Sequence, residues 1–369
     1  KVYANALWCV TKKYGLSVEA PYILNPVIGE LDDPFNQNQS ALTLPLTEDG
    51  NTLIYGVAGS GKLTFVTTMV YELIKNHTTD YLNIYIMDFG AETLKMFEKA
   101  PQVGGVVLSS EAEKVINLMK LLKKEVADRK KLFADYGGDY VSYVKNSGNT
   151  CPNIVVIINN YSPFAESYDE CEDVVSFVSR EGTKYGIYFV VTATNTSSMR
   201  FRIVQNFKRM FVLQMNDKTD YSALLGSVEG TYPAEIKGRG IIKTDHAYEF
   251  QTAKAASEEE LQAKVKELVA EATERCGGKV AKRIPILPKL VDTEYMENTE
   301  VTLDKLPVGV NKKDLSFVSH NLRDNYISYV LAQDVSSVSL VLQGMAELMA
   351  AKIDAKIIVV DAMQSFESG

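Results

Sequence analysis

Nine residues in the first quarter of the chain carry three glycines and a lysine, in the order Gly56-Val57-Ala58-Gly59-Ser60-Gly61-Lys62-Leu63-Thr64. They fit G-x-x-x-x-G-K, the pattern of a phosphate-binding P-loop. An apolar run at 52–55 precedes them, and residues 65–71 follow with helical spacing. This context matters because loop N–H groups and a helix N-terminus bind phosphate oxygens together. The stretch predicts a nucleotide site in which Lys62 reaches the terminal phosphates and Thr64 meets the α-phosphate.

Three positions, one in this pattern and two at the end of a later strand, differ from those of an enzyme that hydrolyses its nucleotide. The residue after the P-loop lysine is usually Ser or Thr, whose hydroxyl ligates Mg²⁺, but here it is Leu63. A buried strand at 153–158 ends in Asn159 and Asn160, where P-loop enzymes carry the carboxylates that hold the metal's water and polarise the attacking water. We therefore expect ATP to bind, with Mg²⁺ held mainly by phosphates and water and by no protein side chain, and hydrolysis to be weak or absent.

Strands alternate with helices along most of the chain. Apolar runs at 82–87, 154–158, 187–193 and 210–213 are separated by helical patterns, and Asp88 stands at the end of the first of them. This alternation is typical of βαβ units. It predicts an α/β fold with a doubly wound, mostly parallel sheet of the P-loop NTPase type.

Composition and charge disfavour several classes of protein. The chain has 369 residues, 46% of them hydrophobic, and a formal net charge of −8. We expect no nucleic-acid partner, because such a charge opposes phosphate binding over a broad surface. The cysteines are dispersed, which predicts reduced thiols rather than disulfides or a zinc site; they are Cys9, Cys151, Cys171 and Cys276. No apolar run is long enough for a membrane span. The sequence also stops soon after a strand-like apolar run, so we expect a soluble fragment whose membrane anchor lies outside it.

A second, weaker copy of the strand–loop–helix pattern follows residue 300. Residues 326–330 read as a strand, 331–337 as the loop, 338–349 as the helix, and 357–361 as a strand ending in Asp361. Without glycine or lysine, this loop is not expected to bind phosphate. The predicted organisation is a linker or helix from a preceding module at 1–20, an ATPase module at 21–255, a linker helix and Pro-containing crossing at 256–302, and the N-terminal part of a degenerate module at 303–369.

Several motifs in this order resemble the FtsK/SpoIIIE-type ATPases, and most of all the EssC-type coupling ATPases of type VII secretion systems. The motifs are Gly56–Thr64, Met87-Asp88-Phe89-Gly90, 101–107, the helix bearing Arg129, 154–161, Arg209 before its strand, and Lys237-Gly238-Arg239-Gly240. Each motif alone is only weakly specific for the family, but their order and spacing together are a strong signal. The resemblance covers essentially the whole chain. In such proteins the chain would be the second ATPase module and the start of the third.

The resemblance implies a RecA/FtsK-like fold in a hexameric motor at the cytoplasmic face of the bacterial membrane. Its partners would be neighbouring modules of the same polypeptide and small helical WXG-type substrates. The family's Walker A serine falls on Leu63, its Walker B carboxylates on Asn159 and Asn160, and its phosphate sensor near Thr194. Arg209 is our first choice for an arginine finger acting in trans, ahead of Arg180 and Arg239.

Three functions stay open at this point. The chain is a secretion-motor module that holds ATP, a DNA-translocating ATPase of the same family, or a nucleotide-free scaffold that docks substrates. Tight duplex binding that weakens steeply with salt would favour the second, and undetectable ATP binding the third.

Overall fold

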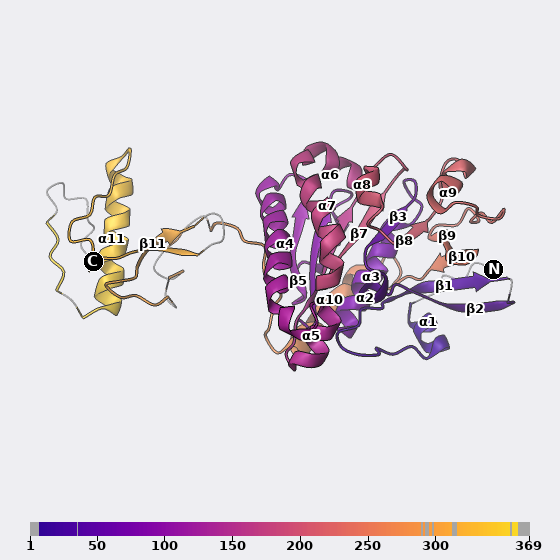
Figure 1. The fold of residues 1–369 in the computed structure, drawn as a ribbon, viewed down its shortest axis with the longest axis horizontal. Helices are drawn as coiled ribbons and strands as arrows, with labels where there is room; N and C mark the ends of the chain where they lie inside the picture. The colour runs from indigo at the N-terminus through magenta and orange to yellow at the C-terminus, as the bar shows by residue number, and fades with distance from the viewer. Residues whose placement is uncertain are drawn as a thin grey trace. The chain divides into compact units, whose positions relative to one another are not determined.

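The computed structural model describes residues 7–34, 36–288, 291, 295–296, 299–311, 316–354 and 356–360, without the side chains of Trp8 and Val335. It divides into two compact units, which meet in sequence between Ile284 and Pro285. Both units are drawn in Figure 1.

A sheet of ten strands forms the centre of the first unit, in the order β2-β1-β10-β9-β8-β3-β7-β6-β4-β5. Six neighbouring strands are parallel: β8 (Arg209–Val212), β3 (Thr52–Tyr55), β7 (Ile187–Ala193), β6 (Asn153–Asn159), β4 (Leu82–Asp88) and β5 (Val103–Leu108). Four antiparallel strands extend the β8 side: β9 (Arg239–Lys243), β10 (Ala247–Thr252), β1 (Val27–Asp33) and β2 (Asn38–Thr43). The predicted mostly parallel α/β sheet is confirmed.

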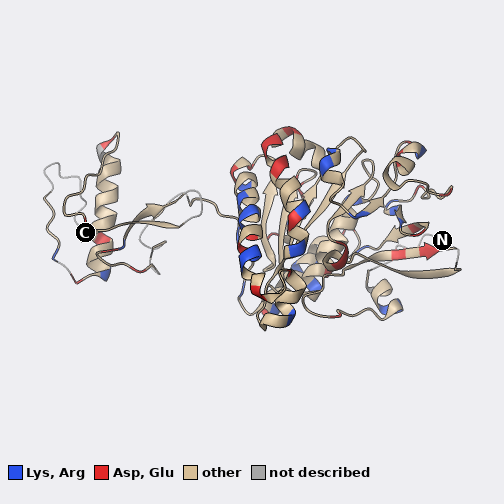
Figure 2. Ribbon diagram, viewed as in Figure 1, with Lys and Arg blue, Asp and Glu red and all other residues tan. Residues whose placement is uncertain are grey.

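Both faces of the sheet are covered because apolar side chains point alternately to the two faces along each buried strand. In β3, Leu53 and Tyr55 face one core and Ile54 faces the other, as the two-residue period of a strand requires. The Ile54 side packs under α3 (Lys62–Asn76), the short 3₁₀ helix η1 (Thr93–Phe97) and α10 (Leu261–Cys276). The other face packs under α4 (Ala112–Leu132), α5 (Tyr140–Ser147), α6 (Tyr161–Ser167) and α7 (Glu172–Glu181). Helix α4 carries many Lys positions (Figure 2), of which 120, 123, 124, 130 and 131 are exposed, whereas its Arg129 is buried.

Helix α10 lies in the first unit rather than in a linker, which differs from our expected boundary. Its Val265, Leu268 and Ala272 are buried in the core beneath α3. The chain beyond it then runs along edge strand β5, where the amide of Ala281 donates to the carbonyl of Pro101 (2.7 Å) and the Tyr85 hydroxyl donates to the carbonyl of Lys282 (2.7 Å). Because this segment covers the unpaired edge of β5, the unit extends to residue 284.

Helix α1 (Leu7–Tyr14) also belongs to the first unit, where it packs on β1 and β2. The amide of Leu7 donates to the carbonyl of Lys254 (2.9 Å), just after β10. The unit also contains the α-helices α2 (Leu46–Asp49), α8 (Phe201–Val204) and α9 (Lys218–Leu225) and the 3₁₀ helices η2 (Ala134–Tyr136), η3 (Asp169–Cys171) and η4 (Gly182–Tyr185).

The described residues of the second unit form the antiparallel strands β11 (Leu306–Val310) and β12 (Phe317–His320) and the helix α11 (Val335–Lys352). The expected helix of the second copy is present, and Asp334 caps it by accepting the amide of Ser337 (2.7 Å). The two expected strands are not: residues 326–330 and 356–360 have no strand structure, and Asp361 lies outside the described residues. Strand β3 has a paired neighbour on each side, whereas the paired strands among the described residues of this unit are β11 and β12 alone, beside one isolated bridge between Thr302 and Lys305.

No helix in the described part of the chain combines the length and apolarity that a bilayer crossing needs. The four cysteines are unpaired; Cys9 is exposed and the other three are buried.

Candidate nucleotide-binding site

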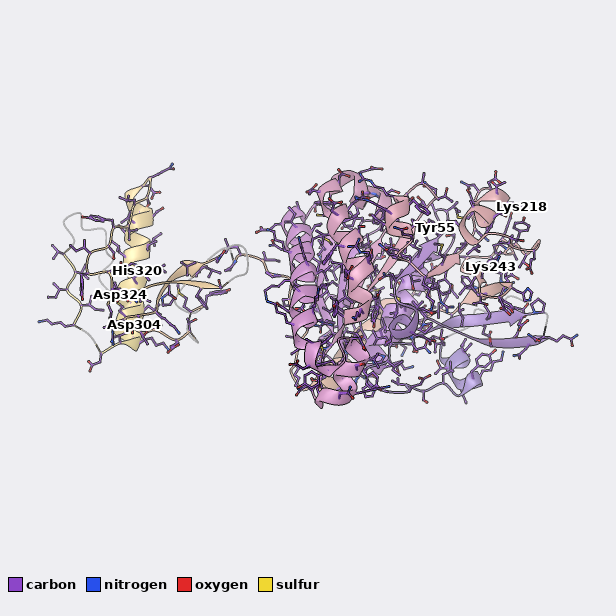
Figure 3. The ribbon with its side chains drawn as sticks, in the orientation of Figure 1. Tyr55, Lys218, Lys243, Asp304, His320 and Asp324 are labelled. Carbon is purple, nitrogen blue, oxygen red and sulfur yellow. The ribbon has the colours of Figure 1, made fainter. Side chains whose placement is uncertain are left out.

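The glycine-rich loop leaves the carboxyl end of β3, at Tyr55 (Figure 3). Strand β3 lies between β7 and β8, so the loop emerges in the middle of the sheet. Two backbone bonds fix its entry: the amide of Gly56 donates to the carbonyl of Ala193 (3.1 Å), and that of Val57 to Gln214 (2.8 Å). Helix α3 begins at Lys62, and no side chain caps its N-terminus. Its first amides are therefore not bound by a capping side chain, as a phosphate site requires.

Three positions of the loop need glycine. A Cβ on Gly56 would lie 2.4 Å from the hydroxyl of Ser60, and one on Gly61 would lie 2.6 Å from the backbone nitrogen of Gly238. Gly59 and Gly61 also have positive φ angles of 79° and 110°. The loop thus fits the tight turn of a phosphate cradle, which larger residues would close or strain.

A segment distant in sequence packs against the loop. The amide of Gly238 donates to the carbonyl of Ser60 (2.7 Å), and the amide of Thr252 donates to the carbonyl of Gly238 (2.8 Å). Residues 237–240 belong to the motifs that resemble the family, but nothing in their sequence indicates that Gly238 contacts the loop. The two closely spaced glycines at 238 and 240, which favour a tight turn, are the only local signal.

Lys62 is the cation of the loop. Its ammonium donates to the carbonyls of Gly56 and Val57, the latter at 2.9 Å. Burial lowers the pKa of Lys62 to about 8. Leu63, next to it, packs partly buried against the core under α3. A leucine has no atom that ligates a metal, so the direct Mg²⁺ ligand of a P-loop enzyme is missing here.

The strand ends beside the loop carry a chain of polar side chains. Asn159 Nδ2 donates to Asp88 Oδ1 (2.8 Å), and the Thr192 hydroxyl donates to Asn159 Oδ1 (2.9 Å). The Thr192 hydroxyl in turn accepts a hydrogen bond from the backbone amide of Asn160 (2.8 Å). Asp88 also accepts the amides of Gly90 (3.2 Å) and Leu94 (3.1 Å) and is fully buried. Both polar atoms of Asn159 are therefore used within the protein.

One large cavity brings most of the predicted site residues together. It has a volume of about 1460 Å³ and is lined by the loop from Val57 to Thr64 except Ser60, and by Asn159, Asn160 and Thr194. Its far wall comes from residues 90–99 and from α10 with the segment before it. Six lysines line it against three glutamates: Lys62, Lys95, Lys99, Lys237, Lys254 and Lys266, with Glu92, Glu98 and Glu258. An excess of positive charge in a chain of net charge −8 suits an anionic ligand.

Arg209 lies apart from this cavity. It opens β8 opposite Thr52, at the amino-terminal ends of these strands and so at the opposite end from the loop, and its guanidinium pairs with Asp49. Burial works to raise the pKa of Asp49, but the hydrogen bonds from Lys208 and Arg209 outweigh it and hold the pKa below its usual value. Arg180 pairs with Glu181 (3.0 Å), and Arg239 donates to Gln251 (3.1 Å). The role of Arg209 as a trans finger stays a prediction.

The donor set fits ATP better than it fits a protein-held metal. The glycine cradle, Lys62 and the N-terminus of α3 match a polyphosphate. Within the described residues, no group of three His, Cys, Asp or Glu could hold a metal ion. That Mg²⁺ is held mainly by the phosphates and water stays a prediction.

Comparisons with known proteins agree with this geometry. A model of the FtsK/SpoIIIE family matches residues 20–230. The type VII secretion system protein EssC of Staphylococcus aureus strain MRSA252 is 27% identical over 318 residues, which cover 81% of this chain and 21% of that protein. The ESX secretion system protein YukB of Bacillus subtilis strain 168 is 26% identical, covering 86% of this chain and 22% of its own length. A solved structure of EssC (ATPases 2 and 3) from Geobacillus thermodenitrificans has a TM-score of 0.81 at 26% identity, covering 91% of this chain and 68% of that one.

Proposed function

Because the chain belongs to the FtsK/SpoIIIE family, we propose that its first unit holds ATP and hydrolyses it slowly or not at all. The proposal rests on a contrast within one cavity, between the residues that would bind phosphate and those that would catalyse hydrolysis. The phosphate cradle is complete, whereas Leu63 has no oxygen for Mg²⁺, and Asn159 and Asn160 carry amides in place of carboxylates. Hydrolysis of bound Mg·ATP would transfer the terminal phosphoryl group to water, and neither Asn159 nor Asn160 can act as a base for that water.

In this proposal each part of the loop has a separate task. The loop amides and the N-terminus of α3 bind phosphate oxygens, Lys62 neutralises the terminal phosphates, and Thr64 meets the α-phosphate. Thr194 senses the terminal phosphate from the end of β7. An amide at position 160 accepts no proton, and loss of a general base costs about 10² to 10⁴ in rate. The site therefore holds its nucleotide for long periods.

We further propose that the module belongs to a type VII protein-secretion motor. The named relatives EssC and YukB support this, although the chain spans about a fifth of their length. In the proposed assembly, the module sits between ATPase modules of the same polypeptide in a membrane-associated homo-hexamer at the cytoplasmic face. Arg209 approaches a neighbour's nucleotide, and the motor exports small WXG-type substrates. The degenerate loop at 331–337 binds no nucleotide.

Calorimetric titration with ATP and MgCl₂, beside steady-state hydrolysis, tests the nucleotide proposal. The variant Lys62→Ala should lose binding, because the cradle then has no cation. A matched control is Lys218→Ala, an exposed lysine on α9 outside the cavity (Figure 3). Turnover near zero in all three proteins is expected.

Two results would contradict the proposal. Turnover above about 1 per second, in the ordinary enzyme range, would refute the impaired site. Undetectable ATP binding would refute nucleotide holding and favour a docking scaffold.

A further inference from the structure

The turn at Lys237 and Gly238 is fixed against the P-loop by its own backbone. Gly238 donates to the carbonyl of Ser60, and the carbonyl of Lys237 accepts the side-chain amide of Gln251 (3.2 Å). Gly238 has a φ of 82°, and a Cβ there would press on Gln251 and Thr252 at 3.2 and 3.3 Å. The backbone from which the Lys237 side chain extends therefore keeps its place beside the loop.

Lys237 lines the same cavity as Lys62 and Thr64. Its ammonium donates to Glu258 (3.1 Å), which lies just before α10 and lines the cavity too. The hydrogen bond from Lys237 lowers the pKa of Glu258, so the glutamate is charged at neutral pH. For the other cavity lysines at 95, 99, 254 and 266, no ion pair is found among the described residues. Lys237 is thus a cavity lysine whose partner is a carboxylate of the same cavity.

We propose that Lys237 is a further polyphosphate-binding residue, and that Glu258 holds its ammonium until nucleotide replaces the carboxylate. The inference rests on the proposed nucleotide function and adds a residue to the same site. The ligand class is a nucleoside di- or triphosphate, or an inorganic polyphosphate, because an ammonium recognises charge and not the base.

The exchange is favourable for two physical reasons. The pair is exposed, with 54% of the Lys237 and 76% of the Glu258 side chain accessible, so it is weak and easily broken. A polyphosphate carries several negative charges where Glu258 carries one, and charge-assisted bonds to phosphate are among the stronger hydrogen bonds. No covalent step is involved.

Calorimetry on the full chain with ATP and MgCl₂, and separately with sodium tripolyphosphate, tests the exchange. Lys237→Ala should weaken both ligands about tenfold, the loss of one charge-assisted hydrogen bond. Glu258→Gln should tighten both about threefold, because the ammonium no longer has to leave a carboxylate. In the background of Lys237→Ala, Glu258→Gln should have no further effect.

Lys264 and Glu267 supply a matched control. They form an ion pair of 2.7 Å on α10 with similar exposure, 49% and 59%, and line no part of the cavity. Lys264→Ala and Glu267→Gln should leave both affinities unchanged.

The outcomes separate the two proposals. If Lys62→Ala abolishes ATP binding while Lys237→Ala and Glu258→Gln change nothing, the exchange is refuted and the nucleotide site stands. If Glu258→Gln tightens binding equally with and without Lys237, its effect is general repulsion and the exchange is again refuted. If the parent chain binds neither ATP nor tripolyphosphate, both proposals fall.

Discussion

Replacing Asn159 with aspartate would place two buried carboxylates in contact. Asn159 Nδ2 now donates to Asp88 Oδ1 over 2.8 Å, and both residues are buried. The substitution Asn159→Asp exchanges the donor for a carboxylate oxygen at about the same distance. Two unit charges there repel by roughly 6 kcal/mol at an effective dielectric of about 20.

The variant avoids that repulsion by taking up one proton. For an aspartate whose unfolded pKa is about 3.9, this uptake costs about 4 kcal/mol at pH 7 and about 1.5 kcal/mol at pH 5. The proton is bound in the folded state and not in the unfolded chain, so the free energy of unfolding falls as pH rises. The variant should therefore be much less stable than the parent at pH 7 and only moderately so at pH 5.

Urea unfolding followed by circular dichroism at both pH values measures this difference. Adding Asp88→Asn to Asn159→Asp should recover most of the loss, because one carboxylate and one amide again face each other. The control Asn160→Asp removes an amide that donates to the carbonyl of Phe89 (3.4 Å), so its cost should vary little with pH. An equal loss at both pH values, or a double variant no more stable than the single, would refute the reasoning.

Three further predictions concern Gly61 and Lys62 of the loop, and the ion pair of Asp49 at the opposite end of the strands. Gly61→Ala should destabilise the first unit by about 1–3 kcal/mol, from the strained φ and the contact with Gly238, and should weaken ATP binding; thermal unfolding should show a smaller loss for Gly59→Ala, whose Cβ meets no atom within 4 Å. ATP affinity should fall about fivefold between pH 8 and pH 9, because the pKa of about 8 leaves Lys62 progressively neutral, and calorimetry on Lys62→Arg should show no such fall. Asp49→Asn should cost about 2 kcal/mol at pH 7, since charged hydrogen bonds are lost, and less below pH 4, because the depressed pKa of Asp49 adds stability only above the ordinary aspartate range; urea midpoints that differ by the same amount at pH 3 and pH 7 would contradict this.

Local patterns were enough to predict the centre of the fold and the loop. Strand β3, the loop and α3 are contiguous, so their spacing in sequence is their spacing in space. The predicted polar ends at Asn159, Asn160 and Thr194 meet at one cavity because β6 and β7 are parallel neighbours.

Contacts between distant segments were not predictable in the same way. The bond between Asp88 and Asn159 depends on β4 lying next to β6, and strand order leaves no local pattern. Gly238 contacts the loop although it lies far from it in the sequence. Helix α10 is mostly charged with only a narrow apolar stripe, so its sequence favours an exposed linker helix over one packed on the core. In the second unit, apolar runs at 326–330 and 357–360 suggested strands, but a strand needs neighbours that the described residues do not supply.

The bond between Gly238 and Ser60 is one link in a longer path through the backbone. From Ser60 the path passes through Gly238 to Thr252, follows the chain to Lys254, and ends at Leu7 of α1. The Thr68 hydroxyl of α3 ties into the same stretch at the carbonyl of Ala253 (2.7 Å). The consequence is mechanical: tension applied to the N-terminal helix is carried to the phosphate loop by main-chain bonds, and neither end shifts far without breaking one.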